Sequence, residues 1–141
     1  AESALKKQLQ YRQVAKTYEA LVWGLLAQPE GRIELPIGPN PDDRPLQQID
    51  QSGKAAVTDY RLLQADGAAH WSRLSLAPQT GRTHQLRVHL NALGHPILGD
   101  AFYAHPEALA MHSRLCLHAL TFSFEHFATG QSLTLGARND F

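Results

Sequence analysis

Residues 80–90, which read Thr-Gly-Arg-Thr-His-Gln-Leu-Arg-Val-His-Leu, concentrate side chains that are suited to binding an anion. The run holds two arginines and two histidines, and no Asp or Glu occurs between Asp66 and Asp100 to neutralise them. It also lies where a turn leads into a helix-like pattern. Because guanidinium groups and the free amides at a helix start both favour negative charge, this junction is suited to holding an anion or a carboxylate. We therefore place the centre of function here.

Residues 83–93 have the pattern of an amphipathic helix. Thr83 can cap its start, and Gly94 can end it. The buried stripe is expected at Leu86, Leu90 and Leu93. The pattern predicts a helix that carries polar side chains directly beside its apolar face.

Arg87 is expected at the boundary between the core and solvent. In a helix, His84, Arg87 and Asn91 share one face, which lies next to the leucine stripe. A guanidinium in this position needs a partner, and a buried carboxylate is the best suited. A solvated helix face, from which the arginine extends into water, fits the same spacing equally well. The spacing alone leaves both interpretations open.

The composition indicates one compact domain. The chain has 141 residues, of which 43% are hydrophobic and 18% charged, and 13 basic residues balance 13 acidic ones. No long uncharged apolar stretch or leader pattern is visible, so we expect no membrane span and a cytoplasmic location. The single cysteine, Cys116, excludes an internal disulfide. Zero net charge neither favours nor excludes a nucleic-acid partner, because the distribution of the charges decides.

Alternating apolar residues predict strands over much of the remaining chain. In the first strand, Tyr18, Ala20 and Val22 are expected on one face and Leu21 and Trp23 on the other. The expected elements are strands at 14–23, 31–37, 55–63, 69–76, 115–124 and 132–135, short helices at 1–10 and 106–111, and a proline-rich loop at 38–48. Strands mixed with a few flanking helices indicate an α+β domain on a largely antiparallel mixed sheet.

Two other kinds of site fit the sequence less well. Eight histidines invite a metal site, but His84 and His89 are five residues apart, and no His-Glu-x-x-His or Cys-x-x-Cys spacing occurs. We therefore expect no bound metal.

Cys116 and His118 fall on the same face of a strand and could form a nucleophile and its base. A cysteine between two leucines is more typical of a small core residue.

Ordered segments along the chain resemble the RluA-type family of RNA pseudouridine synthases. Residues 16–24 are similar to the family's Lys-x-Tyr-x-Ala-x-Val-x-Gly segment, and residues 53–60 to its Gly-Lys-x-Ala-x-Thr-x-Tyr segment. The further matches are 31–37, then 80–89 with 93–100 and Tyr103, and 114–119, which reads Arg-Leu-Cys-Leu-His-Ala. The resemblance implies an α+β fold of the pseudouridine synthase type, and an isomerase that needs no metal or organic cofactor.

One part of the family pattern is missing. The family carries its nucleophilic aspartate in a His-Arg-Leu-Asp segment, and this chain contains none. The resemblance therefore implies that residues 1–141 are the C-terminal portion of a catalytic domain with an incomplete fold. We expect the chain alone to be inactive.

The resemblance also assigns roles to particular residues. It implies that Arg87 pairs with the missing aspartate, which would leave this guanidinium without its charge partner here. Tyr18 matches the active-site tyrosine that packs on the uracil, Leu86 lines the base pocket, and Arg82 and His84 contact phosphate. The implied partner is structured RNA, either rRNA or tRNA, and the intact enzyme is expected to be monomeric. The alternative is a non-catalytic RNA-binding module that uses the same basic face.

Overall fold

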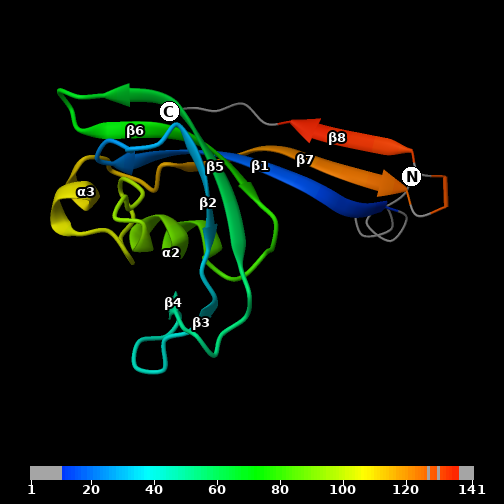
Figure 1. The fold of residues 1–141 in the computed structure, drawn as a ribbon, viewed down its shortest axis with the longest axis horizontal. Coiled ribbons are helices and arrows are strands. Elements are labelled where there is room, and N and C mark those ends of the chain that lie inside the picture. The colour runs from blue at the N-terminus through cyan, green and yellow to red at the C-terminus, as the bar shows by residue number, and fades with distance from the viewer. Residues whose placement is uncertain (1–10, 127, 130, 137–141) are drawn as a thin grey trace.

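An antiparallel sheet forms the framework of the protein in a computed structural model, which describes residues 11–126, 128–129 and 131–136 (Figure 1). The strands are β1 (Tyr11–Trp23), β2 (Glu30–Glu34), β3 (Ile37–Pro39), β4 (Gln47–Ile49), β5 (Val57–Asp66), β6 (Trp71–Pro78), β7 (Leu117–His126) and β8 (Ser132–Gly136). Six of them form one sheet in the order β2-β5-β6-β1-β7-β8, and β3 pairs with β4 in a separate small sheet. Each neighbouring pair is antiparallel, which confirms the predicted fold class.

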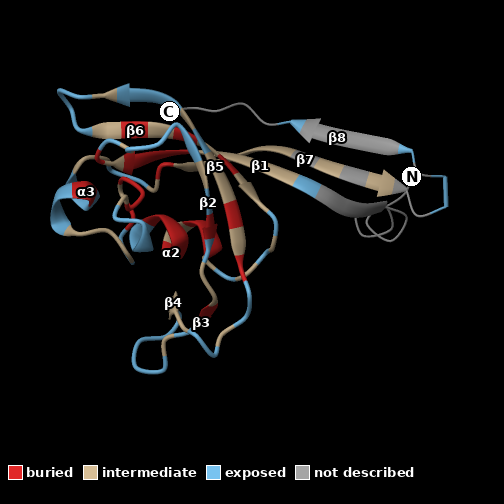
Figure 2. Cartoon of the chain, viewed as in Figure 1, coloured by how far each residue is buried: buried red, intermediate tan, exposed pale blue. Residues whose placement is uncertain are grey.

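Two helices, α2 (Gln85–Ala92) and α3 (Pro106–Ala110), lie on the same side of the large sheet (Figure 1). Leu86 and Leu90 of α2 belong to one buried cluster with Leu74 and Leu76 of β6. Figure 2 shows the buried residues concentrated at the end of the sheet that α2 covers. No helix in the described part of the chain is long and apolar enough to cross a membrane.

Two strands differ in how burial alternates along them. In β6, for which the sequence predicts a strand over 69–76, Ser72, Leu74 and Leu76 are buried and their neighbours are partly exposed. In β1, Leu21 is buried as well as its neighbours on either side, so this end of the strand has no exposed face. The backbone of Leu21 is hydrogen-bonded to Cys116 and to the segment that follows α2. The central strand is therefore covered on both faces where it approaches α2.

The helix predicted at 83–93 is shorter than expected. It begins at Gln85, and His84 precedes it in the left-handed conformation with φ 55°, so Thr83 does not cap it. Leu93 follows the helix with 38% of its surface exposed and is not part of the buried stripe. Gly94 adopts φ 93° directly after the helix, which confirms its role as the end.

The segment predicted as strand 31–37 and loop 38–48 is arranged differently. The strand ends at Glu34, because Pro36 has no amide to continue the ladder, and the chain then turns into β3. The expected loop contains most of β3 and the start of β4, which pair through Ile37 and Ile49. The predicted helix at 1–10 lies outside the described residues.

Candidate active site

A hollow of about 310 Å³ lies between the middle of β1 and the start of α2. The residues that line it come from β1, the end of β6, the turn at 79–84, α2 and the chain leading into β7. They are Lys16, Tyr18, Pro78, Thr80, Gly81, Arg82, His84, Gln85, Leu86, Arg87, Leu115 and Leu117. All five residues singled out from the sequence, namely Tyr18, Arg82, His84, Leu86 and Arg87, lie in this set. We call it the first hollow.

The side chain of Gln85 holds the turn at 80–84 in place. Its Oε1 accepts the Thr80 hydroxyl at 2.6 Å and the Arg82 amide at 3.0 Å. Its Nε2 donates to the Thr58 hydroxyl at 2.9 Å. Gln85 is 4% exposed, so these bonds form away from competing water. A buried glutamine, in place of the expected threonine cap, therefore fixes the entry to the helix.

Arg87 is paired with Asp100 through two hydrogen bonds. Its Nε donates to Oδ2 at 3.0 Å and its Nη2 donates to Oδ1 at 2.6 Å. The Asp100 side chain is fully buried, and that of Arg87 is 16% exposed. Asp100 Oδ1 also accepts the backbone amides of Phe102 and Tyr103, at 3.0 and 3.3 Å. Such a two-point pairing fixes the plane of the guanidinium as well as its position.

This pairing corrects one expectation and decides between two others. The expectation that Arg87 has no charge partner within this chain is wrong, because the turn after α2 brings Asp100 to it. Of the two interpretations that the spacing left open, the pairing with a buried carboxylate is correct. Arg73, also in the stretch without acids, is neutralised by Glu19 of β1 at 2.6 Å. A stretch of sequence that contains no acidic residue can therefore still have acidic side chains beside it in the folded protein.

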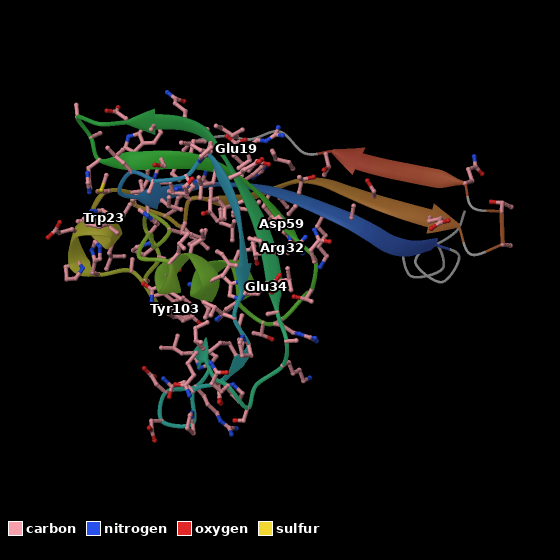
Figure 3. The ribbon with its side chains drawn as sticks, in the orientation of Figure 1. Glu19, Trp23, Arg32, Glu34, Asp59 and Tyr103 are labelled. Carbon is pink, nitrogen blue, oxygen red and sulfur yellow. The ribbon has the colours of Figure 1, made fainter. Side chains whose placement is uncertain are left out.

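Two aromatic side chains lie beside the guanidinium of Arg87, and one of them also contacts His84. The guanidinium carbon of Arg87 lies 5.0 Å from the ring centre of Phe102 and 5.3 Å from that of Tyr103. The Tyr103 hydroxyl accepts the Gln47 amide at 3.0 Å and lies 2.6 Å from His84 Nδ1. Tyr103 therefore sits between α2 and the β3–β4 pair (Figure 3).

His84 is held in its neutral form. Burial, and then the nearby Arg87 cation, lower the pKa of His84 from its ordinary value. The Tyr103 hydroxyl can donate to His84 Nδ1, which leaves the proton of the neutral ring on Nε2. In this tautomer the side chain offers the first hollow a neutral donor.

Burial also affects the tyrosine on the opposite wall. It raises the pKa of Tyr18, so the phenol keeps its proton at neutral pH. Tyr18 lies in β1 opposite Leu76 on one side and Ala119 on the other. Leu86 projects from the first turn of α2 and is 7% exposed. The first hollow therefore combines an aromatic and an aliphatic wall with cationic and neutral donors.

Comparison with known proteins shows the family. The family model described as RNA pseudouridylate synthase matches residues 1–92. The chain belongs to this family. It is 46% identical to the dual-specificity RNA pseudouridine synthase RluA of Haemophilus influenzae, 48% to that of Yersinia pestis and 47% to that of Escherichia coli. The alignments cover 100% of this chain, which spans 64%, 68% and 64% of the length of those three relatives.

Solved structures of the same family have the same fold. Human RNA pseudouridylate synthase domain containing 1 superposes with a TM-score of 0.79 at 29% sequence identity, over 94% of this chain and 56% of that one. Human RNA pseudouridylate synthase domain containing 4 superposes with a TM-score of 0.68 at 23% sequence identity, over 96% of this chain and 60% of that one. The α+β architecture of this chain is therefore that of pseudouridylate synthase domains.

Sequence reasoning missed three residues that organise the site in this member of the synthase family. They are Gln85, Asp100 and Tyr103. A signal existed for all three, because Gln85 belongs to the matching segment 80–89, Asp100 to 93–100, and Tyr103 is matched with them. Their roles could not be read from the local pattern, since partners such as Gln47 and Thr58 lie in segments distant in sequence.

Cys116 is a core residue in the structure. It is fully buried, belongs to the main hydrophobic cluster, and burial raises the pKa of its thiol. A thiol in these surroundings stays protonated and out of reach of substrates, which disfavours the nucleophile alternative. Within the described residues, no group of three or more His, Cys, Asp or Glu side chains is placed to hold a metal ion.

His89 is fully buried in a polar chain that continues from Gln85. Its Nε2 lies 2.8 Å from the Leu35 carbonyl, which can only accept, so this nitrogen carries the proton. Its Nδ1 lies 2.8 Å from the Thr58 hydroxyl, which in turn accepts from Gln85 Nε2. The chain of bonds thus requires neutral His89. Desolvation by burial lowers the pKa of His89 accordingly.

We expect the free energy of unfolding to fall as the pH drops through about 6.5, the ordinary pKa of histidine. The unfolded chain binds a proton at His89 more readily than the folded chain, because the pKa of His89 is lower in the folded chain. The contribution of neutral His89 to the free energy of unfolding is therefore complete above pH 6.5 and is lost as the pH falls toward the pKa of the folded chain. The measurement is urea unfolding of the full-length protein at pH 7.5 and at pH 5.5. His89→Gln should be less stable at pH 7.5 but lose less on acidification. An equal loss in both proteins would show that other groups cause it.

Proposed function

We propose that the protein to which this chain belongs converts uridine to pseudouridine in RNA, and that residues 1–141 are the C-terminal portion of its catalytic domain. One observation carries the proposal. The first hollow gathers Tyr18, Leu86 and Arg87, which all lie within the residues that the family model matches. Its volume, about 310 Å³, is at the lower end of those that hold small ligands, which suits a single nucleobase.

The proposed substrate is structured RNA, either rRNA or tRNA. The curated relatives are described as dual-specificity RNA pseudouridine synthases. A base within a helix cannot reach a hollow in a protein, so the target uridine must be extruded from its stack. We place the reaction in the cytoplasm and expect the intact enzyme to act as a monomer.

The proposed role of Arg87 is to bind and orient a nucleophilic aspartate. Its Nε and Nη2 are used by Asp100, while Nη1 has no partner among the described residues. Because the chain contains no His-Arg-Leu-Asp segment, the aspartate would come from a part of the protein outside residues 1–141. A nucleophilic carboxylate has to be ionised and held still, and an arginine already fixed by Asp100 does both. The chain alone should therefore bind RNA without catalysing the reaction.

The proposed role of Tyr18 is to pack on the uracil, with Leu86 on the other side of the base. In the reaction, the bond from N1 to the ribose breaks, the base rotates and a bond from C5 to the ribose forms. C5 loses a proton and N1 gains one, so the product is an isomer and no outside oxidant or reductant is required. Because burial raises the pKa of Tyr18, its phenol is protonated, and Tyr18 would assist the departure of the C5 proton as a relay: its oxygen takes that proton while its own hydroxyl proton passes to water.

Arg82 and His84 are proposed to contact phosphate. Arg82 Nε donates to the Ala55 carbonyl at 2.8 Å, which fixes the guanidinium beside the first hollow. His84 would contribute its Nε2 proton as a neutral donor, so its contact with phosphate is a hydrogen bond and not an ion pair.

The proposal is tested by tritium release from RNA that contains uridine labelled at C5. The full-length protein is expected to release tritium from rRNA or tRNA transcripts, and residues 1–141 alone are not. Tyr18→Phe should slow release by about 100-fold, the usual order for loss of a proton-transfer group, while RNA binding is retained. Tyr60→Phe is the matched control, because this half-buried tyrosine lies in β5 outside the first hollow.

The same assay separates the second candidate, a non-catalytic RNA-binding module. The observation that favours it is the absence of a His-Arg-Leu-Asp segment from these residues. A full-length protein that binds RNA but releases no tritium from any transcript would support this candidate and overturn the enzymatic proposal.

A further inference from the structure

A second hollow lies on the far side of the turn at 81–83. It has a volume of about 520 Å³ and is bounded by β3, β4, the segment 52–54 and the turn itself. Gly81 and Arg82 line both hollows, so the two lie on either side of the same turn. The reaction proposed for the first hollow does not use the second one.

Three cations follow the path from one hollow to the other. Lys16 lines the first hollow, Arg82 lines both, and Lys54 lines the second. The ammonium nitrogen of Lys16 lies 3.5 Å from the point where a Cβ on Gly81 would stand, and nothing else approaches that point within 4 Å. Gly81 is exposed and has no side chain, so an extended ligand could pass close to the backbone here. We call Lys16, Arg82 and Lys54 the cationic track.

The cationic track differs from three arginines of the described chain in its lack of counter-ions. Arg32, Arg73 and Arg87 each pair with a carboxylate at 2.6–2.7 Å. Within the part of the chain that the structure describes, no member of the cationic track has an ion pair. An unpaired cation remains available to an external anion, and three in succession favour a polyanion over a single ion.

The carboxylate of Asp50 lies beside Gly38, which lines the second hollow, and one of its oxygens is bonded to Ser52. Asp50 Oδ1 accepts the amide and the hydroxyl of Ser52, at 3.0 and 2.8 Å. These bonds lower the pKa of Asp50, so it stays ionised, but it does not line the second hollow. Of the described residues that line either hollow, none is Asp or Glu.

We infer that the cationic track binds the sugar–phosphate backbone of the nucleotides next to the one whose base enters the first hollow, and that Lys54 contacts a phosphate in the second hollow. The inference rests on the proposed function, since it takes RNA as the ligand. When one base of an RNA chain occupies the first hollow, the neighbouring nucleotides must continue along the protein surface away from it. The turn at 81–83 offers an open backbone path with a cation in each hollow and one that lines both, which suits a chain that carries one charge per nucleotide.

The test is the salt dependence of RNA binding by the full-length protein and its Lys54→Ala variant. The probe is a fluorescein-labelled oligouridine of about 12 nucleotides, titrated between about 50 and 200 mM KCl. Each lost phosphate contact to a single strand should reduce the slope of log affinity against log salt by about 0.7. Lys54→Ala should show this reduction, with weaker binding at low salt. Lys54 is exposed and makes no ion pair with a described residue, so the variant should fold normally.

Arg61→Ala is the matched control. Arg61 is exposed in β5 and lines neither hollow, so its loss removes the same charge away from the cationic track. Its salt slope should equal that of the wild type. Equal slopes for Lys54→Ala and the wild type, or equal reductions in both variants, would overturn the inference while leaving the proposed function intact. A wild-type protein that binds no RNA would instead overturn the proposed function itself.

Discussion

Changing Arg87 to lysine in the full-length protein is expected to lower kcat for pseudouridine formation by about 100-fold or more, with RNA affinity nearly unchanged. The guanidinium uses two nitrogens on Asp100 and has a third directed elsewhere. A lysine has one nitrogen on a flexible stem, so it cannot keep the two-point contact with Asp100 and also orient a second carboxylate. The measurement is tritium release under single-turnover conditions, together with direct RNA binding.

Arg73→Lys provides a closely matched control for this change. The Arg73 side chain is 21% exposed and pairs with Glu19 at 2.6 Å, which resembles the 16% and 2.6 Å of Arg87, but it does not line the first hollow. Arg73→Lys should leave kcat close to that of the wild type. Near-normal turnover in Arg87→Lys, or an equal loss in both variants, would remove the proposed role from Arg87.

Asp100→Asn tests whether Asp100 acts through Arg87. The change keeps the shape of the side chain but removes the charge and one acceptor that hold the guanidinium, so we expect a loss of up to about 100-fold in kcat. If Asp100 only positions Arg87, the same change should cost little more in an Arg87→Lys background. Independent losses that multiply in the double variant would show that Asp100 has a separate role. Thermal unfolding of each variant identifies any general loss of structure.

Changing Gly99 to alanine is expected to destabilise the protein by about 3 kcal/mol or more. Gly99 has φ 74°, and a Cβ there would stand 2.0 Å from the Arg114 carbonyl oxygen and 3.2 Å from that of His112. Backbone atoms cannot move aside as the end of a side chain can. The strain would therefore shift the chain next to Asp100, and activity should fall together with stability. Urea unfolding of the full-length protein measures the loss.

Gly94→Ala separates the two causes of that loss. Gly94 has φ 93°, so alanine is strained there too, but no atom lies within 4 Å of its Cβ position. The conformational strain alone should cost about 1–2 kcal/mol. If Gly99→Ala costs no more than Gly94→Ala, the close contact at Gly99 is relieved by small backbone movements and does not control stability.

The local sequence determined most of the secondary-structure elements. Alternation predicted most of the strands, the glycine after α2 predicted where the helix ends, and strands mixed with few helices predicted an antiparallel α+β fold. These predictions succeed because periodicity and glycine conformations are properties of neighbouring residues. The family resemblance assigned Tyr18 and Arg87, distant in the chain, to one site, and both line the first hollow.

Only the tertiary structure decided how the charges and polar groups pair. Asp100 reaches Arg87 because the chain reverses after Gly94, and Glu19 reaches Arg73 because β1 and β6 are neighbours. The helix start depends on Gln85, whose partner Thr58 belongs to β5. Hydrogen bonds and ion pairs act over about 3 Å in space, whatever the separation in sequence. For that reason the stretch without acids looked unneutralised in the sequence, while in the fold Arg87 is held by a buried carboxylate and the cationic track remains unpaired within the described chain.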